Sequence, residues 1–593
     1  MNTSRQKPIP LTKDNSYDSF ANGKPLLNKK KKHLPAMGWN SWNAFGSGNT
    51  AELTKTMSDK IVELGLDKLG YQYMVLDDGC YKSERIDGEL SNETKKFPEG
   101  FKALSDYVHS KELKFGMYND IGTNLCAGAA VGTCGYEDTD AKSYIDWGVD
   151  FLKVDNCYYL WDNATFSDAA NAKYVYTPNI KALRIAGNGF EKTYSAVSDG
   201  MLIGSGAIAE NDYVTNIGTY DGTNVGTTPV GPMSGELVFD AEIPSSGDYS
   251  IHLTYATGEE VGCGSWLQLA VNDNLIYDDF LPATEAPANY TESDAITATL
   301  VSGTNRIRIM NHRRQENTLN SYAALLDGLN KANPSHDIIF SICEWGKTQP
   351  QNWGYKVGDS WRILNDITFQ VGSDGDPGNG RWYDEGTPSV TSQYNKCVVM
   401  DEFAGLDKGW NDPDMMMIGM NGLTETMCET HMAMWCMMNS PLMLGLDLRR
   451  VEKDDSIYNI IANKNLISLN QDTLGIQAKR IFTTAKSTSP DTDYIMDNNR
   501  CDILAKPLAD GSIALSFINL SDKAWNASIG VSINDIMNMI GKKMVNEEAF
   551  AKANAYVVSD LWTGETSENN SGNFEVSGLE AYGNVTLRIS ISK

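Results

Sequence analysis

The sequence predicts an α/β domain of parallel strands that is interrupted by an antiparallel β-sandwich and followed by a second antiparallel β-domain. Three observations lead to this fold class. From about residue 34, short apolar strands alternate with amphipathic helical segments, as in parallel strands joined by crossover helices. This rhythm stops near residue 172 and resumes near residue 319. Strict period-two alternation fills the gap and also the last ~120 residues.

The elements of the α/β domain follow in regular order. An amphipathic helix from Ala51 precedes the strand "YQYMVLDDG", and a helix around "FKALSDYVHSKEL" precedes the strand "KFGMYND". A third helix ends at Trp147 and leads into the strand "VDFLKVDN". Further along, the helix "LNSYAALLDGLNKA" precedes the strand "DIIFSICEW". Each of these strands is therefore expected to run parallel to the next.

The interrupting stretch alternates apolar and polar residues. The segments "GELVFDAEI", "YSIHLTY" and "LQLAVND" each place their apolar side chains on one face, and glycine and proline separate them. The segments "IALSFINL" and "NVTLRISI" near the C-terminus alternate in the same way. We therefore divide the chain into a polar tail (1–33), the α/β domain (34–172 and 318–475), the inserted sandwich (173–317) and a C-terminal antiparallel β-domain (476–593).

The composition limits the classes of partner. A formal net charge of −27 disfavours nucleic-acid backbones. The 10 Cys and 6 His residues lack metal-ligand spacing, so we expect neither a metal nor another cofactor. Residues 1–33 are polar rather than signal-like, and no apolar run is long enough to span a bilayer. We expect a cytoplasmic protein without nucleic-acid or membrane partners, and we leave its oligomeric state open, with a homo-oligomer among the alternatives.

Polar and aromatic residues follow the strands of the α/β domain. The endings are "MGWNSW", "VLDD", "MYND", "KVDNC" and "CEWG". In "FLKVDNCYYL", Lys153 and Asp155 project to the same side of the strand because successive side chains alternate. A structural Lys–Asp pair would explain that one ending. In a barrel of eight parallel strands, however, active sites gather at the strand C-terminal ends, so five such endings indicate an active site.

Two later segments carry further carboxylates. In "SWRILNDI", Arg362 and Asp366 lie four residues apart, and a pair on one helical turn is the structural alternative to a catalytic role. In "GWNDPDMMMIG", Pro413 fixes a turn between Asp412 and Asp414, and turn chemistry alone is the alternative there.

Together with "FGMYNDIG", "NSPLMLGLDLR" and "LNQDTLGIQ", these motifs occur in one order over roughly 34–172 and 319–475. In them the chain resembles glycoside hydrolase family 27, the α-galactosidase family. The resemblance implies a (β/α)8 TIM barrel and a retaining, exo-acting α-galactosidase that hydrolyses terminal α-linked galactose. The alternatives are an α-N-acetylgalactosaminidase, a β-L-arabinopyranosidase, or a sugar-binding homologue without activity.

The resemblance also implies roles for individual residues. Asp155 would be the nucleophile and Asp366 the general acid/base. We expect Lys153 to keep Asp155 ionised and Arg362 to orient Asp366. Glu344 would fill the space of an acetamido group and so favour galactose. The residues expected to bind substrate are Trp42, Asp77, Asp78, Tyr118, Lys153, Cys157, Glu344, Trp345, Arg362 and Asp414.

Two further implications of the resemblance stay open. Secreted relatives pair the cysteines that correspond to Cys126 and Cys157, so these two should be neighbours here, either bonded or as thiols. The inserted sandwich resembles carbohydrate-binding modules, but no cluster of Trp or Tyr marks a sugar platform in it. A structural or oligomerisation role is at least as well supported for the insert.

Overall fold

The computed structural model describes residues 32–157, 177–203, 207–217, 236–257, 265–272, 274–284, 289–310 and 314–592. Eight parallel strands form one sheet in the order β19-β18-β17-β4-β3-β2-β1-β20. From β1 to β19, parallel strands that follow one another along the chain are neighbours in the sheet, and β20 pairs with β1. Their bounds are β1 (Met37–Asn40), β2 (Tyr73–Val75), β3 (Lys114–Asp120), β4 (Phe151–Asp155), β17 (Ile339–Cys343), β18 (Ser360–Arg362), β19 (Trp410–Asp412) and β20 (Leu442–Leu444).

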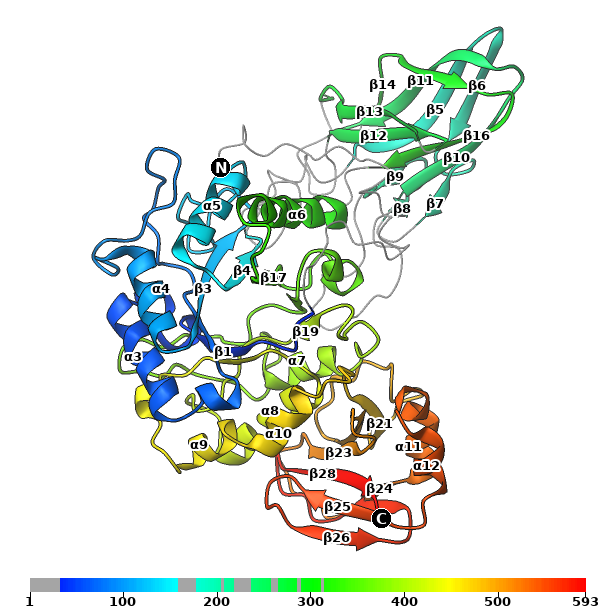
Figure 1. Ribbon diagram of the computed structural model, residues 1–593. Helices are drawn as coiled ribbons and strands as arrows, with labels where there is room; N and C mark the ends of the chain where they lie inside the picture. Colours follow the sequence, from blue (N-terminus) through cyan, green and yellow to red (C-terminus); the bar gives the residue numbers. More distant parts are fainter. Residues whose placement is uncertain are drawn as a thin grey trace.

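The two ends of this sheet approach each other. Met416, which follows β19, donates its backbone N–H to the Met443 carbonyl at 2.8 Å and pairs with Leu444 of β20. The helices lie around the sheet (Figure 1). This arrangement is consistent with a TIM barrel. The helices are α2 (Trp42–Phe45), α3 (Ala51–Glu63), α4 (Gly100–Ser110), α5 (Glu137–Trp147), α6 (Arg314–Ala332), α7 (Val390–Cys397), α8 (Glu425–Met437), α9 (Ser456–Ile461) and α10 (Lys464–Asn470).

Side chains alternate between the two sides of the parallel strands. Phe151 belongs to a small inner cluster with Tyr73, Val75, Ile339 and Met443. Leu152 and Val154 instead pack in the large cluster between the strands and the helices. Because side chains in a strand alternate, Lys153 and Asp155 project to the same side as Phe151. Tyr118 contacts both side chains, since its hydroxyl donates to Asp155 and its ring centre lies 5.4 Å from the Lys153 ammonium, so the predicted shared face of this strand ending is confirmed.

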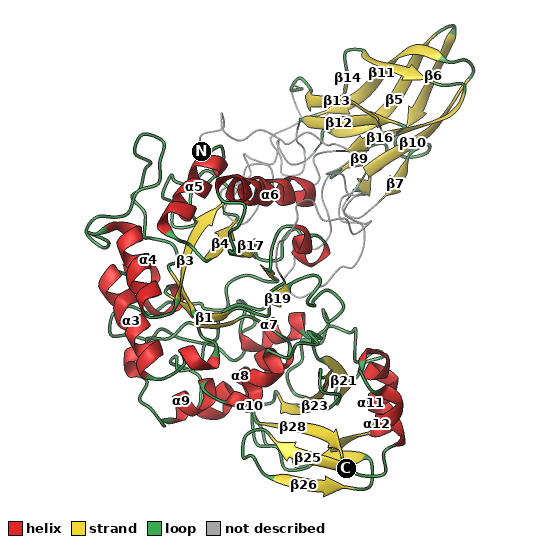
Figure 2. Ribbon diagram, in the orientation of Figure 1, coloured by secondary structure: helices red, strands yellow, loops and turns green. Residues whose placement is uncertain are grey.

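The strands between β4 and α6 are antiparallel and form two sheets, with no helix drawn among them (Figure 2). The apolar residues predicted to share faces, such as Leu237 and Phe239 in one sheet and Ile251 and Leu253 in the other, are buried in one cluster. One sheet contains β13 (Asn274–Phe280), β12 (Trp266–Val271), β16 (Gly303–Met310), β10 (Glu236–Ile243) and β7 (Met201–Ile203). The other contains β14 (Thr291–Glu292), β11 (Gly247–Ala256), β5 (Asn179–Gly187), β9 (Val214–Thr215), β8 (Ile208–Ala209), β15 (Ile296–Leu300) and β6 (Phe190–Ser195).

The C-terminal domain is an antiparallel six-stranded sheet with a two-stranded sheet beside it. It also carries two helices, α11 (Ile533–Ile540) and α12 (Glu547–Lys552), which the period-two pattern did not predict. Ser532 and Asp535 cap the first turn of α11, and its apolar residues recur at helical spacing. The strands are β21 (Lys479–Thr483), β22 (Cys501–Pro507), β23 (Ile513–Asn519), β28 (Asn584–Ile591), β25 (Tyr556–Asp560) and β26 (Thr566–Asn569), with β24 (Ile529–Ser532) paired to β27 (Asn573–Val576).

Buried polar contacts join the C-terminal domain to the parallel-strand domain. Tyr394 of α7 donates its hydroxyl to Asp502 of β22 at 3.0 Å, and Arg500 donates to Asn395 at 2.6 Å. Figure 1 shows this domain beside α7 and α8 and away from the inserted strands. Among the described helices, none is both long and apolar enough to cross a bilayer.

Candidate active site

The predicted site residues lie near or just beyond the C-terminal ends of seven of the eight parallel strands. This is the edge at which a barrel of this kind places its active site. The residues, in the order of their strands, are Trp42 after β1, Asp77 and Asp78 after β2, Tyr118 in β3, Lys153, Asp155 and Cys157 at β4, Glu344 and Trp345 after β17, Arg362 and Asp366 at β18, and Asp414 after β19.

Asp155 is the last residue of β4 and is 5% exposed. Its Oδ2 accepts hydrogen bonds from the Tyr118 hydroxyl and from the Cys343 thiol, both at 3.3 Å. Its Oδ1 accepts the Asn156 backbone N–H at 2.8 Å. The register of the sheet sets these neighbours, because Cys343 of β17 lies directly opposite Asp155. Three donors therefore hold the carboxylate in one orientation.

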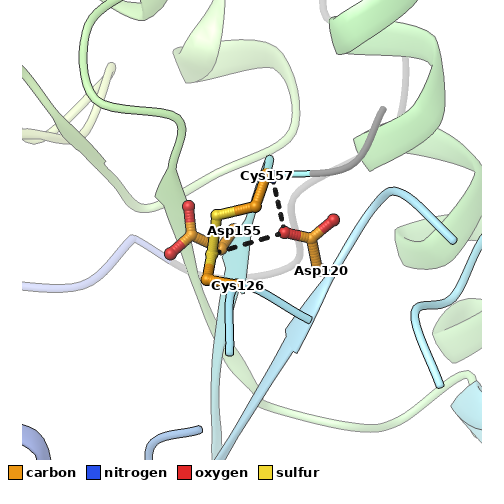
Figure 3. A group of neighbouring side chains, drawn as sticks. All are labelled: Asp120, Cys126, Asp155 and Cys157. Carbon is orange, nitrogen blue, oxygen red and sulfur yellow. Dashed lines mark hydrogen bonds between the residues drawn. A yellow bond between two sulfur atoms is a disulfide. The ribbon is translucent and has the colours of Figure 1, made fainter. Parts of the chain in front are cut away.

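Asp120 lies directly opposite Asp155 on the other side, at the end of β3 (Figure 3). It is fully buried and accepts the backbone N–H groups of Gly122 at 2.6 Å and Cys157 at 2.7 Å. Burial, and then the charge of Asp155, raises the pKa of Asp120 well above its usual range. The two carboxyl groups therefore titrate as a coupled pair, in which the charge of each disfavours ionisation of the other.

Cys126 and Cys157 form a disulfide, with their Cα atoms 5.2 Å apart. The bond ties the loop after β3 to the residue that follows Asp155 by two positions (Figure 3). The ligand-type atoms of Asp120, Cys126, Asp155 and Cys157 lie within 4.8 Å of one another. A metal would need the sulfurs as thiolates, and here they are bonded to each other. This group is therefore a cross-link behind Asp155.

Lys153 does not bond to Asp155. Its ammonium donates to Oδ2 of Asp77 at 2.8 Å, and in the described part of the chain it makes no ion pair with Asp155. Asn40 donates to the same Asp77 oxygen at 2.8 Å, and the Ser41 hydroxyl accepts the Asp77 backbone N–H. Asp77 and Lys153 thus form a fixed charge pair at the ends of β2 and β4.

The charge of Lys153 acts on the pKa of Asp155 in the expected direction, towards the ionised form, but burial acts against it. Burial raises the pKa of Asp155 to about 6; Lys153 opposes this rise, and Asp366 adds to it. The reason is that the ammonium is engaged with Asp77, while the carboxylate is withdrawn from water. Burial likewise raises the pKa of Asp78 to about 6, although the backbone N–H groups of Gly79 and Ala127 bond to it.

Arg362 connects the second predicted carboxylate to the rest of the site. Its Nη2 lies 3.1 Å from Asp366 and 2.7 Å from Asp414. The pair with Asp366 does not belong to a helical turn, because Arg362 ends β18 and Asp366 lies in the non-helical chain beyond it. Arg362 is 2% exposed, whereas the Asp366 side chain is 41% exposed. Desolvation raises the pKa of Asp366, and Arg362 opposes the rise.

Cys343 and Arg362 bridge the two catalytic candidates. The Cys343 thiol donates to Asp155 at 3.3 Å, and Nη1 of Arg362 lies 3.6 Å from the same sulfur. Nη2 of Arg362 donates to Asp366 at 3.1 Å. A chain of three short contacts therefore joins Asp155 to Asp366, two carboxyl groups that are 211 positions apart in the sequence.

Two further site residues adopt left-handed backbone conformations. Trp345 has φ +61° and Asp414 has φ +78°, values that cost non-glycine residues about 1–3 kcal/mol and cluster at functional sites. Asp414 is held in place by the backbone N–H groups of Ile367 and Met415, at 2.9 and 2.7 Å. The Lys347 ammonium lies 4.2 Å from the centre of a ring of Trp345.

The remaining predicted residues line the same edge. Glu344 is 1% exposed, and its Oε2 accepts the backbone N–H and the hydroxyl of Thr348, both at 2.8 Å. Trp42 packs against the inner cluster.

Three residues of the site were not predicted as site residues, although they stand inside the quoted motifs. Asp120 ends "MYND", Cys343 begins "CEWG", and Asp412 precedes the proline of "WNDPDM". Burial raises the pKa of Asp412 to about 6. The sequence offered one signal for these three residues. Each is the last residue of its parallel strand, and its side chain points to the same side of the sheet as Asp155.

Comparisons with known proteins agree with this geometry. A family model described as Alpha galactosidase A matches residues 34–187 and 309–472, which is more than half of the chain. A second, described as the Alpha galactosidase C-terminal beta sandwich domain, matches residues 498–589.

Curated relatives and solved structures point the same way. The chain is 27% identical to alpha-galactosidase A of Cellvibrio japonicus, over 94% of this chain and 92% of the relative. It is 26% identical to an alpha-galactosidase of Cyamopsis tetragonoloba, over 85% of this chain and 76% of the relative. The crystal structure of alpha-galactosidase I from Mortierella vinacea shares the fold with a TM-score of 0.59 at 21% identity, over 95% of this chain and 99% of that one. The chain therefore belongs to the α-galactosidase family, glycoside hydrolase family 27.

Proposed function

We propose that the protein is an exo-acting α-galactosidase that releases terminal α-linked D-galactose with retention of configuration. The observation that carries this proposal is the bridge from Asp155 through Cys343 and Arg362 to Asp366. Retaining glycosidases need two carboxyl groups on opposite sides of one anomeric centre, one as nucleophile and one as acid/base. The family membership of the chain supports the substrate class.

In the first step, Asp155 attacks the anomeric carbon and forms a glycosyl ester. Asp366 donates its proton to the glycosidic oxygen, and the aglycone leaves as an alcohol. The raised pKa of Asp366 favours the protonated form that this step requires. Asp155, with a pKa of about 6, is ionised at neutral pH.

In the second step, Asp366 removes a proton from water, and the resulting oxygen nucleophile attacks the same carbon from the side opposite Asp155. The ester bond breaks, galactose leaves with its original configuration, and both carboxyl groups return to their starting states. The 41% exposure of the Asp366 side chain lets it meet incoming water.

The substrate-binding roles divide along the strand ends. Asp77, Asp78, Lys153, Arg362 and Asp414 would bind hydroxyl groups through charge-assisted hydrogen bonds. Trp42 and Trp345 offer apolar ring faces for the C–H side of the sugar, and Tyr118 and the Cys126–Cys157 disulfide back the nucleophile. Glu344 would meet the 2-hydroxyl of galactose and exclude an acetamido group, because its buried side chain fills the space that the bulkier group would need.

We further propose that residues 173–317 form an inserted β-sandwich and that the parallel strands of 34–172 and 318–475 form a (β/α)8 barrel. The support for the sandwich is that both antiparallel sheets contribute to one apolar cluster, and that the family match stops at 187 and resumes at 309.

Hydrolysis of p-nitrophenyl α-D-galactopyranoside, followed by proton NMR of the first-formed sugar anomer, tests the proposed reaction. The α-anomer should appear first. Asp155→Asn should lower kcat by about 10⁴-fold or more while the protein stays folded, as loss of a covalent nucleophile does. Release of the β-anomer first, or wild-type turnover by Asp155→Asn, would refute the mechanism.

Azide distinguishes the two roles. With Asp155→Ala, azide fills the place of the nucleophile and should yield β-galactosyl azide; with Asp366→Ala it replaces water in the second step and should yield α-galactosyl azide. The opposite products would exchange the two assignments.

A further inference from the structure

A cavity of about 320 Å³ lies where the parallel-strand domain meets the C-terminal domain. Trp382 and Tyr383, in the chain between β18 and α7, form one wall. Residues 496–499, 520–522 and Tyr582 form the other. None of the lining residues belongs to the candidate active site. The volume falls within the roughly 300–1,000 Å³ typical of small-molecule sites.

The walls of the cavity are fixed by contacts that cross the domain boundary. The Trp382 indole N–H donates to the Leu520 carbonyl at 3.3 Å, and its ring lies edge-on to Tyr582 with centroids 5.5 Å apart. The Tyr582 backbone N–H donates to the Ser521 carbonyl at 3.0 Å. On the same boundary, Asn498 donates to the Thr391 hydroxyl of α7 at 2.9 Å. The cavity therefore keeps its shape without a ligand, which lowers the entropic cost of binding one.

The lining combines an exposed aromatic ring with polar groups. Tyr383 is 49% exposed. The carboxylates of Asp497 and Asp522 lie in the lining with the amide of Asn499. Among the described residues, nothing accepts a hydrogen bond from the Asn499 side-chain nitrogen. A ligand that fits these groups has one apolar face to lie on a ring and several hydroxyl groups to bond to carboxylate and amide.

Charge narrows the class of ligand further. The lining contains two aspartates and no Lys, Arg or His, and the whole chain carries a formal charge of −27. Phosphorylated, sulfated or carboxylated ligands would be repelled. Among the described residues, Asp497 and Asp522 do not belong to a cluster of three or more potential metal ligands. The class of ligand that these groups can still bind is a neutral ring that carries several hydroxyl groups.

We propose that this cavity is a second carbohydrate-binding site, which takes a neutral pyranose unit of an oligosaccharide or polysaccharide. A site of this kind holds a carbohydrate chain on the protein and raises the effective concentration of its other ends near the enzyme. The proposal stands on the lining chemistry alone and does not depend on the reaction proposed for Asp155 and Asp366.

Affinity electrophoresis of the full chain in gels that contain galactomannan tests the site. The Asp155→Asn background prevents hydrolysis of the gel polysaccharide. The Asp155→Asn chain, which is the parent for the other variants, should be retarded by the galactomannan. Tyr383→Ala in this parent should weaken binding about 3- to 10-fold, as loss of one aromatic contact does. Tyr383→Phe keeps the ring and should bind like the parent. Val545→Ala, which changes a 61% exposed apolar residue of the same domain outside the cavity, should also bind like the parent.

Asn499→Ala provides a second loss-of-binding variant, should Tyr383→Ala fold poorly, and thermal unfolding of both variants verifies folding. A gel that contains polygalacturonate tests the charge argument, and we expect no retardation there. The proposal is overturned if the parent is not retarded by galactomannan, if both loss variants bind like the parent, or if polygalacturonate retards the parent equally.

The activity assay keeps this proposal separate from the proposed function. With Asp155 intact, Tyr383→Ala should hydrolyse p-nitrophenyl α-galactoside at the wild-type rate, because this small substrate has no second sugar to place in the cavity. If the wild-type chain does not hydrolyse this substrate, the α-galactosidase proposal is refuted, and the retardation result is unaffected.

Discussion

Replacement of Cys343 by alanine is expected to move the pH dependence of hydrolysis to higher pH. The Cys343 thiol donates to Asp155 Oδ2 at 3.3 Å. Burial, and then the Asp155 charge, raises the pKa of Cys343 well above its usual range, so the group stays a thiol and keeps its proton to donate. That hydrogen bond stabilises the ionised form of Asp155 and so lowers its pKa. Without it, the pKa of Asp155 rises from its value of about 6.

The size of the effect follows from the energy of one such hydrogen bond. A thiol is a weak donor, so this bond to a charged acceptor contributes only about 0.5–1.5 kcal/mol, and one pKa unit corresponds to about 1.36 kcal/mol. The acidic limb of the kcat/KM profile should therefore move upward by about 0.4 to 1.1 pH units. At pH values below the limb, where the ionised fraction falls tenfold per unit, the variant should be about 2- to 13-fold slower than the wild type for this reason alone.

The measurement is a pH profile of kcat/KM on p-nitrophenyl α-galactoside. Cys343→Ser keeps a hydrogen-bond donor at the same place. The acidic limb of its kcat/KM profile should therefore lie at the same pH as that of the wild type or at a lower pH. Cys501→Ala removes a buried free thiol from β22 of the C-terminal domain and serves as the matched control for loss of a thiol. Coincident acidic limbs in the alanine variant and the wild type would refute the role of Cys343 in setting the ionisation of Asp155.

Three other substitutions probe separate parts of the site. Glu344→Ser should lower kcat/KM on the galactoside by roughly 10- to 150-fold, because a charged hydrogen-bond partner is worth about 1.5–3 kcal/mol. It should also raise the relative rate on the α-N-acetylgalactosaminide, and an unchanged ratio of the two rates would contradict the role of Glu344 in specificity. Arg362→Met should lower the free energy of unfolding by about 3–5 kcal/mol, because buried Asp414 loses its cation; a denaturant titration with the wild-type midpoint would count against this. Asp155→Asn should raise the free energy of unfolding by up to about 3 kcal/mol at pH 8 and by little at pH 4. The pKa of Asp155 is about 6 in the folded protein and near 3.9 in the unfolded chain. Between these pH values the folded wild type binds more protons than the unfolded chain, so it loses stability as pH rises. An equal gain in the free energy of unfolding at pH 8 and pH 4 would exclude this cause.

Local patterns in the sequence were sufficient to predict most elements of the fold. The helices α3 to α6 and the strands that follow them stand where periodicity predicted them, because each segment carries its own 3.6- or 2-residue repeat. The first of these helices ends at Glu63, and Gly65, at φ +71°, lies just beyond its end. The helices α11 and α12 were missed because they are short and stand among strands with period-two patterns.

The sequence by itself determined which side of β4 carries Lys153 and Asp155, since alternation along a strand is a local property. Only the tertiary structure decided the partners of those two residues. Lys153 pairs with Asp77 because strand register, set by the whole sheet, brings the end of β2 to it. Asp155 lies between the carboxyl group of Asp120 and a thiol from β17, in surroundings whose burial no local pattern reports. Ionisation depends on burial and on distant charges, and both exist only once the chain has folded.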